Sequence, residues 1–199
     1  MSSLNRNIVL VHGLWDSPNV FNPLVSYLCN KNTCIFSPDL LHDEGRIPLT
    51  KLAINLNHSI LERFGTHTPI DLFGFSMGGV ISRIWLQKFG GALRTRRFIS
   101  VGAPHYGTFS AQFVPSWFRS GIADMKRGSH LLRELNKDVD LLQSVKCSSY
   151  FCRWDLVVFP GWQAVLPIGP SHSLPVLTHR ALISNSKSLE ILGTALLSD

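Results

Sequence analysis

The chain has 199 residues, of which 45% are hydrophobic and 16% are charged, and its formal net charge is +6. This composition excludes a disordered or low-complexity protein, and the length predicts a single domain over residues 1–199. No apolar run approaches the roughly 18 residues that a membrane span needs. The first residues lack the apolar stretch and cleavage site of a secretory signal, so we expect a cytoplasmic location.

Strand and helix patterns alternate along much of the chain. Continuous apolar runs predict buried parallel strands, and apolar residues four apart between residues 49 and 64 predict an amphipathic helix. The expected strands lie at residues 7–11, 34–36, 70–73, 98–101, 150–154 and 174–177. Further helices are expected after Gly79, from Ser129 to Asn136, and from Ser186 onward. The fold class is therefore α/β, with a mostly parallel sheet of about six strands that is covered on both faces.

The string Gly74-Phe75-Ser76-Met77-Gly78 stands between the third expected strand and the helix that follows it. A G-x-S-x-G sequence in this setting forms a sharp turn, which presents the serine hydroxyl above the sheet edge. The glycines are needed because bulky neighbours would collide with adjoining strands. The helix directs its amino end at the reaction centre, where negative charge develops. The motif predicts Ser76 as the nucleophile of an acyl-transfer reaction.

An activated serine needs a base, and the base needs an orienting acid; in this arrangement they follow in the order Ser, Asp/Glu, His. Asp155 closes the fifth expected strand, where it is either this acid or a turn residue. His179 follows the sixth expected strand and is the favoured base, whereas His172, in the loop before that strand, is expected at the opposite edge. The rival acids, in surroundings typical of an insertion or helix, are Asp124, Asp138 and Asp140.

The oxyanion formed in acyl transfer needs at least two N–H donors. We expect them from the backbone of Met77, directly after the nucleophile, and of Leu14, in the loop after the first strand. His12 is expected to order that loop by hydrogen bonding, and Trp15 either lines the substrate cleft or belongs to the core. Neither the cysteines nor the histidines show metal-ligand spacing, so no metal is expected.

Residues 105–145 break the alternation and form an aromatic-rich insertion. Its apolar side chains recur at spacings of three to five, which fits either an acyl-chain groove beside the site or the core of an inserted helix. The candidate substrate-binding residues are Trp15, Phe109, Phe113 and Trp117.

Three strings carry a resemblance to a known family: V-L-V-H-G-L at 9–14, G-F-S-M-G-G at 74–79 and S-V-G-A-P-H-Y-G-T at 100–108. Together they resemble the lipase/esterase branch of the α/β-hydrolases, and the third is similar to a segment of small bacterial triacylglycerol lipases. The resemblance implies a minimal α/β-hydrolase fold and ester hydrolysis through an acyl-serine without a cofactor, with Asp155 and His179 at the acid and base positions. The short chain leaves no room for a large lid domain.

One departure from the family follows the second strand. Family members often show Gly-His-Gly there, whereas this chain has Leu41-His42-Asp43. We expect this loop to lie outside the chemistry.

The sequence thus favours hydrolysis of lipid or other acyl esters, with two alternatives. A thioesterase or acyltransferase would use the same triad, and a non-catalytic binding module can share the fold. The basic charge and the aromatic insertion would suit peripheral contact with an acidic membrane surface, although scattered basic residues also simply aid solubility. The tight basic group Arg94, Arg96 and Arg97 has no nucleic-acid motif beside it, so no nucleic-acid partner is expected.

Overall fold

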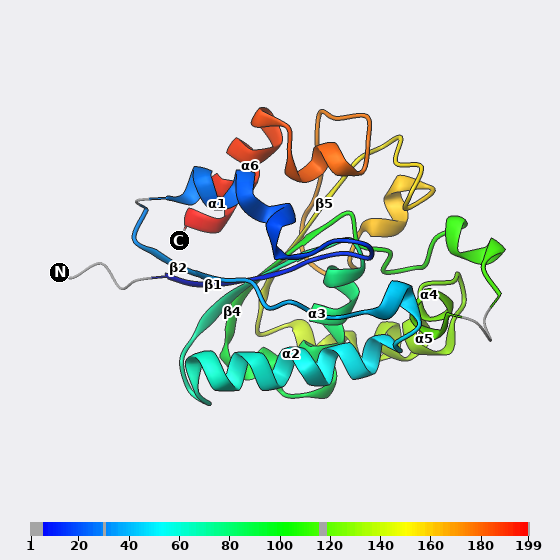
Figure 1. Cartoon of the computed structure of the whole chain (residues 1–199), viewed down its shortest axis with the longest axis horizontal. Coiled ribbons are helices and arrows are strands. Elements are labelled where there is room, and N and C mark those ends of the chain that lie inside the picture. Colours follow the sequence, from blue (N-terminus) through cyan, green and yellow to red (C-terminus); the bar gives the residue numbers. More distant parts are fainter. Residues whose placement is uncertain (1–5, 30, 116–118, 199) are drawn as a thin grey trace.

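The computed structural model describes residues 6–29, 31–115 and 119–198 (Figure 1). A sheet of six strands, ordered β2-β1-β3-β4-β5-β6, runs through these residues, and every neighbouring pair is parallel. The strands are β1 (Arg6–Val11), β2 (Thr33–Phe36), β3 (Ile70–Phe75), β4 (Thr95–Val101), β5 (Lys146–Phe151) and β6 (Ser171–Ser173). The α/β class and the parallel six-stranded sheet are confirmed.

Helices cover both faces of the sheet. Figure 1 shows α1 (Asn22–Leu28) and α6 (Ser186–Leu197) on one side, and α2 (Leu49–Phe64) and α3 (Met77–Lys88) on the other. The short α4 (Ser120–Asp124) and α5 (His130–Lys137) lie on the α2/α3 side. Two separate apolar clusters, one on each face, result from this three-layer arrangement.

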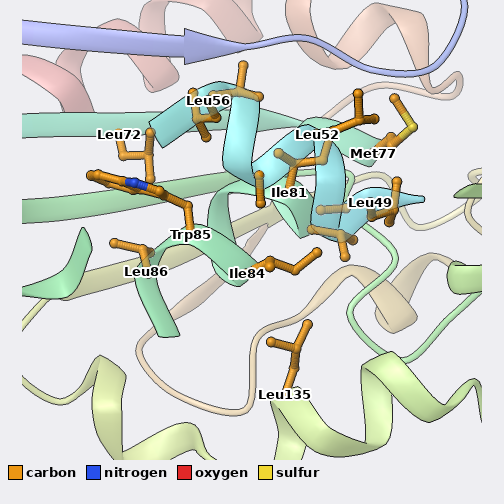
Figure 2. Close-up of a cluster of buried hydrophobic side chains, with 14 of the residues drawn as sticks. Leu49, Leu52, Leu56, Leu72, Met77, Ile81, Ile84, Trp85, Leu86 and Leu135 are labelled. Carbon is orange, nitrogen blue, oxygen red and sulfur yellow. The ribbon is translucent and has the colours of Figure 1, made fainter. Parts of the chain in front are cut away.

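The central strand and its helices show why these segments fold as they do. All six residues of β3 are buried, because a parallel sheet covered on both faces has no solvent side. On α2, Leu49, Leu52 and Leu56 form a buried stripe that packs in one cluster with Ile81 of α3 (Figure 2). Each such leucine contributes about 1.5–3 kcal/mol by leaving water.

The last two strands begin earlier than the sequence predicts. The fifth strand is Lys146–Phe151 rather than 150–154, and the sixth is Ser171–Ser173 rather than 174–177. Trp154, expected inside a strand, is 67% exposed in the following loop. The prediction failed because it relied on apolar residues. β5 contains two serines, and β6 is a short, exposed edge strand with no apolar side chain.

The three clustered arginines make hydrogen bonds and ion pairs within the fold. Arg94 donates to the carbonyl oxygen of Thr68 at 2.7 Å. Arg96 pairs with the carboxylate of Asp71 at 3.0 Å, and Arg97 approaches the same carboxylate at 3.7 Å. Asp71 is fully buried on β3, so the cluster neutralises a carboxylate that would otherwise be costly to bury. Among the described residues, no helix has the length and apolar character to cross a bilayer.

Candidate active site

Ser76 occupies a strained turn between β3 and α3. Its φ of 55° and ψ of −128° lie in a region that residues with a side chain rarely adopt. The turn fits only because its neighbours lack side chains: a Cβ on Gly78 would come within 2.1 Å of the Val11 carbonyl oxygen, and one on Gly74 within 2.5 Å of the Gly79 Cα. The Ser76 N–H donates to the carbonyl of Val101, at the end of β4, at 2.8 Å.

Asp155 and His179 form a close pair, with 2.6 Å between the Asp155 Oδ2 and the His179 Nδ1 atoms. Asp155 is 1% exposed. A carboxylate only accepts, so the proton of this hydrogen bond is assigned to Nδ1, which leaves Nε2 as an acceptor. That Nε2 atom is buried and has no hydrogen-bond partner among the described residues. It is therefore available to a group that enters the site.

The His179 ring lies next to the segment that carries the serine. Its centroid is 4.9 Å from that of Phe75, which directly precedes Ser76. A Cβ on Gly102, just beyond β4, would come within 2.9 Å of the His179 Cε1 atom. Ser76 and His179 both line a cavity of about 450 Å³ at the carboxyl edge of the sheet. The structure thus brings Ser76, Asp155 and His179 to one place.

The alternative base and one rival acid lie elsewhere. His172 is on the edge strand β6, where its ring stacks on that of Tyr150 at 5.0 Å, and it lines a different hollow. Asp124, at the end of α4, accepts the N–H of Leu49 at 2.9 Å and so caps α2. Burial raises the pKa of the Asp124 carboxyl.

The loop after β1 passes directly beside the serine. A Cβ on Gly13 would come within 2.9 Å of the Ser76 Cβ, and the adjacent Leu14 lines the cavity. Met77 is the first residue of α3, so its N–H has no acceptor within the helix. Both residues expected to supply oxyanion donors are therefore neighbours of Ser76; their role as donors stays a prediction.

Two histidines hold this loop. The His12 Nδ1 donates to the Gly13 carbonyl at 3.0 Å, and its Nε2 accepts the Leu40 N–H at 3.0 Å, as expected of a residue that orders the loop. The His42 Nε2 accepts the Trp15 N–H at 3.1 Å. Burial lowers the pKa of His42, which favours the neutral ring that this acceptor role needs.

Through His42, the loop after β2 contacts the loop beside Ser76, although the sequence placed it apart from the site. No signal in the sequence pointed to this contact, because Trp15 and His42 lie 27 residues apart and no spacing rule joins them. In the same loop, the Glu44 carbonyl accepts from the Arg119 guanidinium at 2.7 Å, which ties the loop to the start of α4.

The cavity wall differs in part from the residues expected there. Trp15 lines the cavity, but Phe109 and Phe113 do not. The Phe109 ring lies 4.3 Å from the Arg127 guanidinium carbon, and Phe113 is 88% exposed. Trp117 lies outside the described residues. The insertion contributes smaller and aliphatic side chains instead, together with the loop after Asp155: Ala111, Val114, Ile122, Met125, Leu156, Val157 and Val158.

No group of three or more His, Cys, Asp or Glu side chains among the described residues could hold a metal ion.

The fold and this edge of the sheet define an α/β-hydrolase. The sequence matches the model of the alpha/beta hydrolase family over residues 8–184, so the chain belongs to that family. A comparison with curated proteins gives no match to this sequence.

Solved structures of lipases and esterases share the fold. The mature lipase of Bacillus licheniformis is 17% identical with a TM-score of 0.78, and the match covers 98% of this chain and 93% of that one. Lipase B of Aspergillus fumigatus is 13% identical with a TM-score of 0.79; the match covers all of this chain and 55% of that protein. An esterase of Exiguobacterium antarcticum is 17% identical with a TM-score of 0.71, covering 98% and 93%. These neighbours agree with the resemblance to lipases and esterases.

Proposed function

We propose that this protein is a serine hydrolase that cleaves carboxylic esters through an acyl-serine intermediate. One observation carries the proposal: His179, held through its Nδ1 by the buried Asp155, has an Nε2 without a partner among the described residues, at a cavity that Ser76 also lines. An acid, a base and a serine on a strained strand-to-helix turn are the parts that acyl transfer requires. Membership of the alpha/beta hydrolase family supports this assignment.

In the first half of the reaction, the His179 Nε2 takes the Ser76 proton while Oγ attacks the ester carbonyl carbon. The N–H groups of Leu14 and Met77 stabilise the negative oxygen of the tetrahedral intermediate. As the intermediate collapses, the carbon–oxygen bond to the alcohol breaks, and the alcohol leaves with the proton from His179. Asp155 holds the imidazole in the productive tautomer and stabilises the imidazolium.

In the second half, His179 takes a proton from water as the water oxygen attacks the acyl carbon. The bond to Ser76 then breaks, Oγ recovers the proton from His179, and the carboxylic acid leaves. The enzyme returns to its starting state, and one ester and one water have become one alcohol and one acid.

The size and lining of the cavity suit an uncharged, apolar acyl group as the part of the substrate that binds there. Its volume of about 450 Å³ lies in the ordinary range of small-molecule sites. Apart from the residues assigned to chemistry, the wall is mainly aliphatic, with Val114, Ile122 and Met125 among its members. The charged side chains at its rim, Asp16 and Arg180, are paired with each other.

Initial rates on p-nitrophenyl esters from acetate to palmitate test the proposal, with Ser76→Ala as the blank. We expect turnover that depends on Ser76 and His179. The matched control is His172→Ala, because this histidine lies outside the cavity and its loss should leave the rate unchanged. Loss of activity in His172→Ala but not in His179→Ala would contradict the assignment. Thioesters with the same acyl chains, run in parallel, separate an esterase from a thioesterase.

We also propose peripheral contact with an anionic membrane surface as the setting of this reaction. Large apolar side chains are exposed around the cavity mouth: Trp15 is 69% exposed and Leu156 81%. The basic net charge of the chain favours an anionic surface. An exposed apolar rim on a basic protein suits shallow insertion at the headgroup level.

Sedimentation with anionic and neutral vesicles tests this contact. Binding should be stronger to anionic vesicles and should weaken with added salt, because salt screens exposed charges. Leu156→Ser should reduce binding. The control is Leu93→Ser, since Leu93 is 93% exposed but precedes β4, at the opposite edge of the sheet from the cavity. Salt-independent binding, or equal loss in both variants, would contradict the proposal.

A further inference from the structure

An ion pair at the cavity joins the loop after β1 to the segment that follows His179. The Arg180 Nη1 contacts the Asp16 Oδ1, and both side chains line the cavity. Asp16 belongs to the loop after β1, two residues beyond Leu14, and Arg180 directly follows His179. The pair thus links the loop expected to bind the oxyanion with the segment that carries the base.

The other oxygen of Asp16 lies beside Gly13, the residue that also borders Ser76. A Cβ on Gly13 would come within 3.1 Å of the Asp16 Oδ2 and within 3.4 Å of the Ser76 Oγ. The carboxylate and the nucleophile therefore flank the same glycine. The Asp16 side chain is only 13% exposed, so water screens its charge poorly.

A free negative charge at this position would oppose the proposed reaction in two ways. It would repel the oxyanion as it forms, and it would favour the protonated His179 ring, which cannot act as a base. The charged side chains on the segments around His179 are Asp155, Asp16 and Arg180. Asp155 is hydrogen-bonded to His179, and Arg180 is the cation paired with Asp16. Arg180 therefore balances the charge of Asp16.

The same loop needs to be held in place. Trp15, between Leu14 and Asp16, has a φ of 60°, which is costly for a bulky residue. Its N–H is held by His42. The Asp16–Arg180 pair fixes the next residue of the loop.

We propose that Arg180 is a positioning residue that neutralises Asp16 and joins the oxyanion loop to the segment of the base. The inference rests on the proposed function, because the charge matters only if an oxyanion and an imidazolium form at this site. Arg180 touches neither of them, and it acts through Asp16.

Three variants test the inference through kcat/KM and its dependence on pH. Arg180→Gln leaves Asp16 unbalanced, so we expect kcat/KM to fall about tenfold and the acid limb of the profile to move to higher pH. In the double variant Asp16→Asn/Arg180→Gln, two neutral amides can still hydrogen-bond. It should recover to within about threefold of the wild type with the acid limb restored. Arg180→Lys, which keeps the charge, should lose less than Arg180→Gln.

The outcomes separate this inference from a purely structural ion pair and from failure of the proposed function. If the ion pair only stabilises the fold, kcat/KM of the double variant should be no higher than that of Arg180→Gln, and the pH profile should not move. Either result overturns the inference. If no ester is turned over, the rate of Ser76 labelling by a fluorophosphonate replaces kcat/KM. Absence of labelling in the wild type would refute the proposed function and the inference together. Normal labelling with an unaffected Arg180→Gln would refute the inference alone.

Discussion

Asp155 binds His179 with one carboxylate oxygen and the cavity wall with the other. Oδ2 lies 2.6 Å from the His179 Nδ1, while Oδ1 accepts the N–H groups of Val157 at 2.8 Å and Val158 at 3.0 Å. Both valines line the cavity. Asp155 therefore orients the His179 ring and also fixes the loop that forms part of the cavity wall.

Asp155→Asn separates these two duties. The amide oxygen can still accept from Val157 and Val158, but its NH₂ group favours the His179 tautomer with the proton on Nε2, which cannot serve as a base. We expect kcat to fall by roughly 10³- to 10⁴-fold with little loss of stability, as measured by steady-state kinetics and urea unfolding. Asp155→Ala should also destabilise the fold, by about 1–3 kcal/mol for each N–H left without an acceptor. Activity of Asp155→Asn within tenfold of the wild type would contradict the role of the carboxylate.

We expect the strained backbone at Ser76 to lower the free energy of unfolding measurably. Because Ser76 has a φ of 55°, Ser76→Gly relieves strain that Ser76→Ala retains. Both variants should lose Ser76-dependent turnover, and the glycine variant should be more stable than the alanine variant by about 1 kcal/mol in urea unfolding. An alanine variant at least as stable as the glycine variant would show that the turn is unstrained.

Acid should destabilise the protein through its buried histidines. Burial, with Arg83 nearby, holds the pKa of His105 well below its ordinary value, and its Nε2 lies 2.7 Å from the Ser100 hydroxyl. Below about pH 6.5 the unfolded chain binds a proton at this position that the native chain does not. Stability should therefore decline as pH falls below 6.5, by up to about 1.4 kcal/mol per pH unit for each such group.

His105→Gln removes this titration and can still hydrogen-bond to Ser100. Its free energy of unfolding, measured by urea titration from pH 7 to pH 5, should fall less steeply than that of the wild type. His58→Gln is the control, because His58 is exposed on α2. Equal slopes in the wild type and His105→Gln would show that His105 does not govern the acid sensitivity.

The cavity wall predicts which residues set acyl-chain preference. Val114 lines the cavity, whereas its neighbour Phe113 is 88% exposed outside it. Val114→Phe should narrow the cavity and shift the p-nitrophenyl ester profile towards shorter chains. Phe113→Ala should leave the profile unchanged. A shift in Phe113→Ala alone would mean that the aromatic side chains, rather than the aliphatic wall, contact the acyl group.

Periodicity and local motifs predicted most of the fold. The apolar stripe of α2 located that helix over Leu49–Phe64, because its buried leucines recur with the helical repeat. The strand-to-helix setting of Ser76 predicted the strained turn. Prediction failed at β6, since a three-residue edge strand of Ser171, His172 and Ser173 carries no apolar signal and is held by backbone pairing to β5.

The sequence predicted the candidate site residues that directly follow strands. It did not predict the contacts that depend on how one loop packs against another. Asp155 and His179 come together because both follow late strands at the carboxyl edge. The contact of His42 with the Trp15 N–H and the pairing of Asp16 with Arg180 join segments far apart in sequence, and no spacing rule encodes them. In the insertion, aromatic character drew attention to Phe113, whereas the short 3₁₀ turn at Ser110–Phe113 buries Ala111 instead.

The central claim is that Ser76 carries the acyl group during turnover. Acid-quenched reactions with a p-nitrophenyl ester, analysed by intact mass and peptide mapping, test it most directly. The account predicts an adduct of the acyl mass on the peptide that contains Ser76, absent in Ser76→Ala and strongly reduced in His179→Ala. Turnover with an adduct on another residue, or an unchanged rate in Ser76→Ala, would contradict it.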